Sequence, residues 1–103
     1  KLEQEIIAVQ VPDISAELRH QLVEFVSELR ALSLKKVPAV SETIDWARAL
    51  LLLNVHSLDH EWIKSTLNLL LKFQDDIEVV VPEIYPLLKK AQQKTLHQKP
   101  EQP

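Results

Sequence analysis

Apolar side chains that recur every three or four residues are the feature of this sequence that most limits its fold. The clearest series is Leu18, Leu22, Phe25, Leu29 and Leu32. Such spacing places apolar residues on one side of an α-helix, which packs against other helices. Charged residues fall on the opposite, solvent-facing side: Glu17, Arg19, Glu24, Glu28 and Arg30. No segment alternates polar and apolar residues as a strand does, so we expect an all-α fold, a small bundle of about four to five helices.

Cap residues and prolines predict the helix boundaries in the first half of the chain. A short first helix should end just before Pro12, because proline disfavours the helical conformation of the preceding residue. A second helix should begin after Asp13 or Ser15 as its N-cap. Residues 33–38 have no periodicity and contain a proline, so they should connect the second and third helices.

The third helix should have Ser41 as its N-cap and run to about Leu53. Almost every residue from 44 to 53 is apolar, so we expect this to be the central helix of the bundle. Trp46 lies within that apolar stretch, which favours a place in the core over an interface.

Three further helices are predicted in the second half of the chain. The fourth should begin after Asp59 as its N-cap and end near Phe73. Asp75 and Glu78 have the three-residue spacing of a capping box, which indicates a short fifth helix. A final helix should have Pro86 at its first position, where a missing amide matters least.

Length and composition indicate a single domain of ordinary size. Of the 103 residues, we assign 1–96 to a helical domain and the polar, proline-rich residues 97–103 to a disordered tail. Cysteine is absent, which excludes disulfides and thiolate metal sites. The net charge of −3 and the scattered basic residues disfavour nucleic-acid binding, and no apolar run is long enough to cross a membrane. We therefore expect a cytoplasmic location.

The complete lack of glycine excludes several functions. Loops that cradle phosphate groups need glycine for positive φ and close backbone approach, so a complete nucleotide site cannot be built from these residues. A hydrolase of the nucleophile-elbow type is disfavoured for the same reason. The sequence also lacks methionine and begins with lysine, which we interpret as the mark of an excised fragment.

Two clusters of polar residues are candidates for chemistry. His56 and His60 are four residues apart, but His56 precedes the predicted N-cap Asp59, so the two rings should diverge and no metal site is expected. Glu42, Asp45 and Arg48 share one face of the third helix. They either form a local ladder of ion pairs or are aimed at a ligand or a neighbouring subunit, and periodicity leaves both readings open.

Residues 41–50, which read SETIDWARAL, resemble the ETIDWARAL signature of one branch of the MoxR-like AAA+ ATPases. Upstream, the sequence from Glu5 to Pro12 is similar to the first lid helix of that branch, and residues 29–38 are similar to the approach to the signature. Downstream, residues 66–77 are similar to its closing helix. The resemblance covers about residues 2–78.

This resemblance implies a C-terminal lid, a helical bundle that follows a P-loop domain, closes over ATP and contacts neighbouring subunits of a homo-oligomeric ring. It also implies a chaperone-like remodelling role, with a von Willebrand factor A domain protein as a partner. The fragment alone should bind no cofactor, because the residues that bind ATP and magnesium would lie upstream of Lys1. Four residues become candidates for the nucleotide border or the subunit interface: Ser41, Glu42, Asp45 and Arg48.

The third helix departs from the general AAA+ pattern at its start. Many AAA+ lids place an arginine there, called sensor 2, whereas this sequence reads Ala39-Val40-Ser41-Glu42 and has no arginine before Arg48. The alternative function is a free-standing helical adaptor that binds a partner through an apolar groove.

Overall fold

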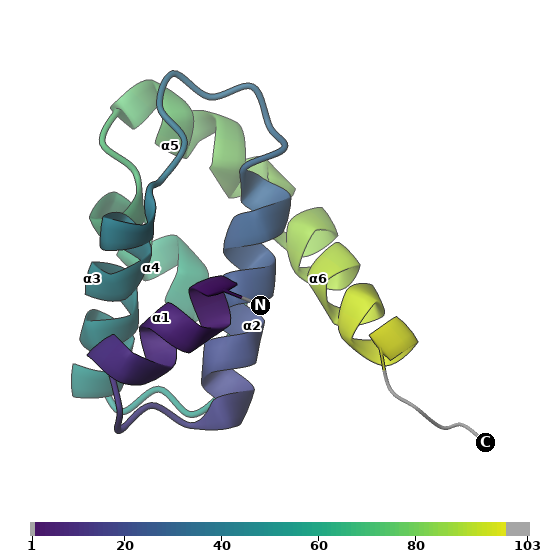
Figure 1. Cartoon of the computed structure of the whole chain (residues 1–103). Coiled ribbons are helices and arrows are strands. Elements are labelled where there is room, and N and C mark those ends of the chain that lie inside the picture. The colour runs from purple at the N-terminus through teal and green to yellow at the C-terminus, as the bar shows by residue number, and fades with distance from the viewer. Residues whose placement is uncertain (1, 99–103) are drawn as a thin grey trace.

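Helices make up most of the chain that the computed structural model describes, residues 2–98, with side chains described for residues 2–93. This part of the chain contains α1 (Leu2–Gln10), α2 (Ala16–Leu29), α3 (Val40–Leu52), α4 (His60–Leu70), α5 (Gln74–Val80), the 3-10 turn η1 (Val81–Glu83) and α6 (Ile84–Gln98). It has no strand, so the predicted all-α bundle is confirmed (Figure 1). None of its helices combines the length and the apolar content needed to cross a bilayer.

The bundle is built around α2, which packs against α1, α3 and α6 (Figure 1). Of the two predicted candidates, Asp13 and Ser15, the N-cap is Ser15, whose hydroxyl accepts a hydrogen bond from the Leu18 amide at 3.1 Å. Of the apolar series predicted to face inward, Leu18, Leu22, Phe25 and Leu29 are buried, together with Val23 and Val26. Leu32 lies beyond the end of α2 and is only partly buried. Removal of this much apolar surface from water is the main favourable contribution to folding.

The prediction that the third helix is central is wrong, because α3 lies at one side of the bundle against α1, α2 and α4. Its buried residues are Thr43, Trp46, Ala47 and Leu50. In contrast, Leu52 is 84% exposed and Leu53 is 49% exposed. An apolar sequence does not by itself specify which of its side chains are covered.

The N-terminus of α3 also differs from the prediction. The N-cap is Ala39, so Ser41 lies inside the first turn. A methyl group cannot accept a hydrogen bond, and the cap is made instead by Glu42, whose Oε1 accepts from the Ala39 amide at 2.8 Å. This contact is the reciprocal half of a capping box, and it satisfies the amide just outside the helix.

The turn after α3 has the geometry that glycine usually supplies. Asn54 has a φ of 60°, the only positive φ among the described residues. The Val55 amide donates to the Leu50 carbonyl at 3.0 Å, and the Asn54 amide donates to the Leu51 carbonyl at 3.0 Å. These paired bonds form a Schellman motif, and asparagine is the residue other than glycine that most readily adopts its left-handed position.

α4 begins where predicted and ends early. Asp59 is the N-cap, and its Oδ1 accepts from the Trp62 amide at 2.9 Å. The helix stops at Leu70, because Leu71 is extended with a φ of −114° and a ψ of 138°. The predicted end near Phe73 is therefore wrong, and Phe73 is the N-cap of α5 with 45% of its surface exposed.

α6 lies along α2 and begins at Ile84, so Pro86 is its third residue and not its first. An amide is still not needed at that position of a helix. Three side chains of this helix were predicted to face inward, and Leu87 and Ala91 are buried while Leu88 is partly buried. Residues 97–98, which were predicted to belong to a disordered tail, are helical. The rest of that predicted tail, 99–103, lies outside the described residues.

Candidate functional site

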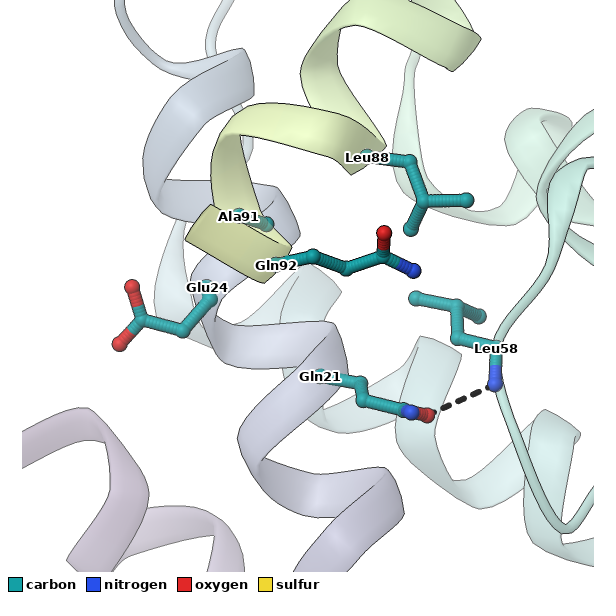
Figure 2. Close-up of a pocket in the computed structure, with 6 residues that line it drawn as sticks. All are labelled: Gln21, Glu24, Leu58, Leu88, Ala91 and Gln92. Carbon is teal, nitrogen blue, oxygen red and sulfur yellow. Dashed lines mark hydrogen bonds between the residues drawn. The ribbon is translucent and has the colours of Figure 1, made fainter. Parts of the chain in front are cut away.

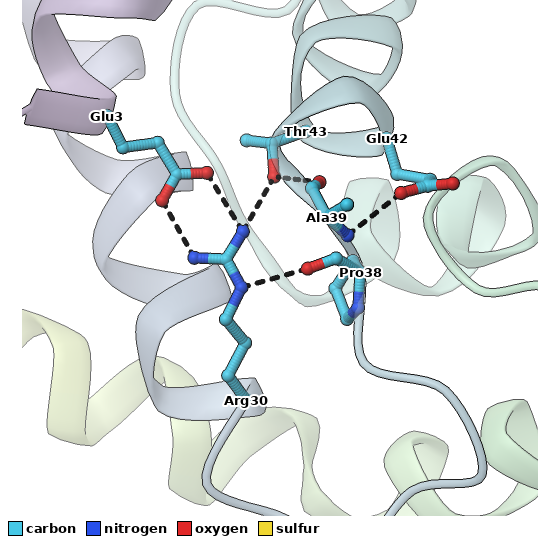
Figure 3. A network of polar contacts seen from close by, with 6 residues as sticks. All are labelled: Glu3, Arg30, Pro38, Ala39, Glu42 and Thr43. Carbon is cyan, nitrogen blue, oxygen red and sulfur yellow. Dashed lines mark hydrogen bonds and ion pairs between the residues drawn. The ribbon is translucent and has the colours of Figure 1, made fainter.

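Arg30, the C-cap of α2, connects three helices through one side chain (Figure 3). Its Nη1 and Nη2 donate to the two carboxylate oxygens of Glu3 on α1, at 2.8 and 3.0 Å. Its Nε donates to the Pro38 carbonyl at 2.9 Å, and Nη2 also donates to the Thr43 hydroxyl at 3.4 Å. We call these four residues the Arg30 network. Its forked, charge-assisted bonds hold α1 and the start of α3 against the end of α2.

The Arg30 network is largely shielded from water. The side chains of Arg30 and Glu3 are 29% and 15% exposed. Hydrogen bonds from Arg30 hold the pKa of Glu3 below its ordinary value, although burial acts in the opposite direction. The prediction that Arg30 faces solvent is therefore wrong. α2 ends at this residue, and its side chain is within reach of the carbonyl of Pro38 in the following connection.

The Glu42 side chain is bonded to two other residues of this chain. Its carboxylate accepts from the Ala39 amide, and its Oε2 lies 3.3 Å from Nζ of Lys72, which follows α4. The Ala39 amide is the main cause that lowers the pKa of Glu42, with Lys72 also contributing. The exposed Ser41 hydroxyl lies 3.5 Å from the same Glu42 carboxylate. Of the predicted site residues, these two therefore contact each other at the first turn of α3.

Asp45 and Arg48 form a separate pair further along α3. Their side chains lie 3.9 Å apart and are 70% and 50% exposed. Nη2 of Arg48 also lies 3.3 Å from Oε1 and 3.5 Å from the carbonyl oxygen of Gln10, at the end of α1. The predicted ladder thus forms between Asp45 and Arg48, while Glu42 bonds elsewhere. An exposed pair of this kind adds little stability.

Asp76 is the most buried carboxylate among the described residues, at 2% exposure. Its Oδ1 accepts from the Lys35 amide at 2.7 Å, and its Oδ2 accepts from the Lys36 amide at 3.1 Å. It thereby anchors the α2–α3 connection to α5. The predicted capping box of Asp75 and Glu78 is wrong, since α5 already begins at residue 74 and Asp75 pairs with Nζ of Lys35 at 2.6 Å. Sequence analysis missed Asp76.

The two histidines lie in different surroundings. His56 is exposed in the turn before α4, as the position of the N-cap Asp59 predicted. His60 stacks on the ring of Tyr85 from α6, with the ring centres 4.3 Å apart. Within the part of the chain that the structure describes, no three His, Cys, Asp or Glu side chains are grouped so that they could hold a metal ion.

A small cavity lies between α2, α6 and the residue Leu58 (Figure 2). Gln21 forms part of its wall and fixes Leu58 by accepting from its amide at 2.8 Å. The cavity has a volume of about 20 Å³, which is enough for a single water molecule. It is far too small for a nucleotide.

Comparison with protein-family models, with curated proteins and with solved structures finds no match to this chain.

Proposed function

We propose that this chain is the C-terminal lid subdomain of a MoxR-like AAA+ ATPase. The observation that carries the proposal is the resemblance of residues 41–50 to the signature of that lid, with similar segments on both sides. The all-α bundle is compatible with it, although small helical bundles serve many unrelated functions. In this proposal the parent protein is a chaperone-like remodelling motor that forms a ring and acts with a von Willebrand factor A domain partner.

The geometry at the start of α3 restricts what the lid does in this proposal. The Glu42 carboxylate already lies at the positive end of the helix dipole, bonded to the Ala39 amide and paired with Lys72. It would repel a γ-phosphate brought to the same place. ATP and magnesium are therefore assigned to the upstream P-loop domain. The exposed residues Ser41, Asp45 and Arg48 are assigned to contacts with that domain or with a neighbouring subunit.

The nature of the upstream sequence tests this proposal first. A P-loop motif within about 200 residues before residue 1 supports a lid, whereas a start codon close to residue 1 contradicts it. A second test is titration of the chain itself with ATP, followed by amide chemical shifts. We expect no saturable binding in the micromolar range, because the backbone cradle and magnesium ligands of an ATP site are missing from the sequence.

Substitution of Arg48 in the parent ATPase tests the interface. Arg48→Ala should lower ATPase turnover or ring formation while the melting temperature of the lid stays nearly unchanged, since the Asp45 pair is exposed. Lys64→Ala is the matched control, because Lys64 is an exposed cation on α4. If Arg48→Ala destabilises the lid and spares activity, the residue has a structural role and the interface assignment is wrong.

Exposed apolar residues favour a second candidate, the helical adaptor. Val9 is 75% exposed and Leu52 is 84% exposed, on helices that pack against each other. Single exposed apolar residues are common on protein surfaces, so the adaptor requires a partner that contacts both of these side chains. The upstream sequence separates the two candidates, because an adaptor needs no P-loop domain.

A further inference from the structure

α1 is attached to the bundle by few apolar contacts. Ile7 is its one fully buried residue, while Leu2 and Val9 are 69% and 75% exposed. The buried residues Val11 and Ile14 follow it in the connection to α2. Apolar packing therefore holds the end of α1 where it joins the rest of the chain, and holds the opposite end weakly.

Polar side chains supply the other contacts of α1. Gln4 accepts from Nε of Arg19 at 3.2 Å, and its Nε2 lies 3.1 Å from Nδ1 of His20. The strongest contact is that of Glu3 with Arg30, since it is bidentate, charged and mostly shielded from water. It lies near the free end of the helix, where apolar packing is weakest.

The Arg30 network is arranged so that α1 can leave without breaking the remainder. If α1 moves away, the Glu3 carboxylate gains water, and Arg30 keeps its bonds to the Pro38 carbonyl and the Thr43 hydroxyl. A helix of nine residues is marginal on its own in water, so a detached α1 also loses helical structure. Detachment breaks the contacts of Glu3, Gln4 and Ile7 and the contact of Arg48 with Gln10, and local openings of this size occur in other proteins without global unfolding.

We propose that α1 is a detachable arm, held against α2 and α3 by the Glu3–Arg30 ion pair as a latch and hinged at Val11. Release of the latch uncovers the surface of α2 and α3 on which Ile7 packs, while α2, α3, α4 and α6 stay folded. The proposal concerns a conformational device and holds whether or not the chain is an ATPase lid.

Amide hydrogen exchange of the whole chain tests the latch. Glu3→Gln keeps the shape of the side chain and removes its charge, so it weakens the pairing with Arg30. We expect exchange of the Ile6 to Gln10 amides to increase by about tenfold, with less than about a twofold change in α2 and α4. Glu5→Gln is the matched control, because Glu5 is an exposed carboxylate on the same helix. It should leave exchange in α1 unchanged.

Arg30→Lys provides the second variant. Lysine keeps the positive charge, but it cannot bond both Glu3 oxygens through a fork while it also reaches Pro38 and Thr43. It should raise exchange in α1 in the same selective way. An equal increase of exchange in α1, α2 and α4 would show that the pair supports global stability only. Unchanged exchange would show that the pair does not hold α1 against the bundle. Either result overturns the proposal.

Discussion

The interior of this protein and its outer segments are stabilised by different forces. Where α2, α3 and α4 meet, apolar side chains exclude water, and a buried hydrogen bond joins the Trp46 indole to the Thr66 hydroxyl at 2.7 Å. The outer segments, namely α1, the α2–α3 connection and α5, are held by carboxylates: Glu3, Glu42 and Asp76. Apolar burial is not directional, whereas hydrogen bonds are. The contrast teaches that apolar packing brings the helices together, whereas single carboxylates fix the positions of the outer segments.

The largest effect should come from opening the interior. Leu50 and Leu67 are 0% and 1% exposed, so Leu50→Ala or Leu67→Ala should each lower the free energy of unfolding by about 2–5 kcal/mol. Leu52→Ala, at an 84% exposed site on the same helix as Leu50, should cost less than about 0.5 kcal/mol. Urea unfolding followed by circular dichroism measures all three. Equal losses at Leu50 and Leu52 would remove the distinction between the two faces of α3.

The next largest loss of stability is expected at Asp76, the carboxylate that joins α5 to the α2–α3 connection. Asp76→Ala leaves the Lys35 and Lys36 amides without their acceptor and should cost about 1–3 kcal/mol. The neighbouring change Asp75→Ala removes an ion pair whose side chains are mostly exposed and should have little measurable effect. Urea unfolding of the two variants compares a buried with an exposed carboxylate in one helix. Similar losses would mean that burial does not matter here.

A smaller effect is expected at the turn after α3. Asn54→Ala forces a residue with a β-carbon into positive φ without the local hydrogen bonding of asparagine, and should cost about 1 kcal/mol. Asn54→Gly should be neutral or slightly stabilising, because glycine adopts this conformation without strain. Thermal unfolding distinguishes the two substitutions. A glycine variant as unstable as the alanine variant would indicate that the asparagine side chain, and not its backbone conformation, matters.

The smallest effect should appear on acidification. Because the folded state lowers the pKa of Glu3 from its ordinary 4.5, pairing with Arg30 adds stability above that pH, and the contribution is lost as pH falls through the lowered value. The difference in unfolding free energy between the wild type and Glu3→Gln should therefore be constant near neutral pH and shrink below about pH 4.5. Urea unfolding at a series of pH values measures it. A difference that grows on acidification would contradict the lowered pKa.

Local signals in the sequence predicted a large part of the fold. Pro12, Ser15 and Asp59 mark the helix boundaries that the structure has at those places, because a cap or a proline acts on its own backbone neighbours. The burial of Leu18, Leu22, Phe25 and Leu29 followed from spacing alone. In the candidate site, the contact of Asp45 with Arg48 was predictable for the same reason, as a pair three residues apart on a helix.

Contacts between distant residues could not be predicted in this way. Arg30 is 27 residues from Glu3, and Asp76 is 41 residues from Lys35, so no periodicity connects them. For Glu42, spacing left open a ladder along its helix or a contact outside the chain, yet Glu42 pairs with Lys72 just beyond the end of α4. An arginine at the end of a helix, before an irregular connection, was the one available sign of the Arg30 network.

The buried indole of Trp46 gives the chain an internal optical reporter. Its ring is fully covered, it donates to Thr66, and it lies 6.0 Å from the ring of Phe25 on α2. Fluorescence from such an indole shifts to longer wavelength when water reaches it. Trp62 on α4 is only partly covered, so a Trp62→Phe variant isolates the emission of Trp46. Opening where α2, α3 and α4 meet can then be followed in real time without an attached dye.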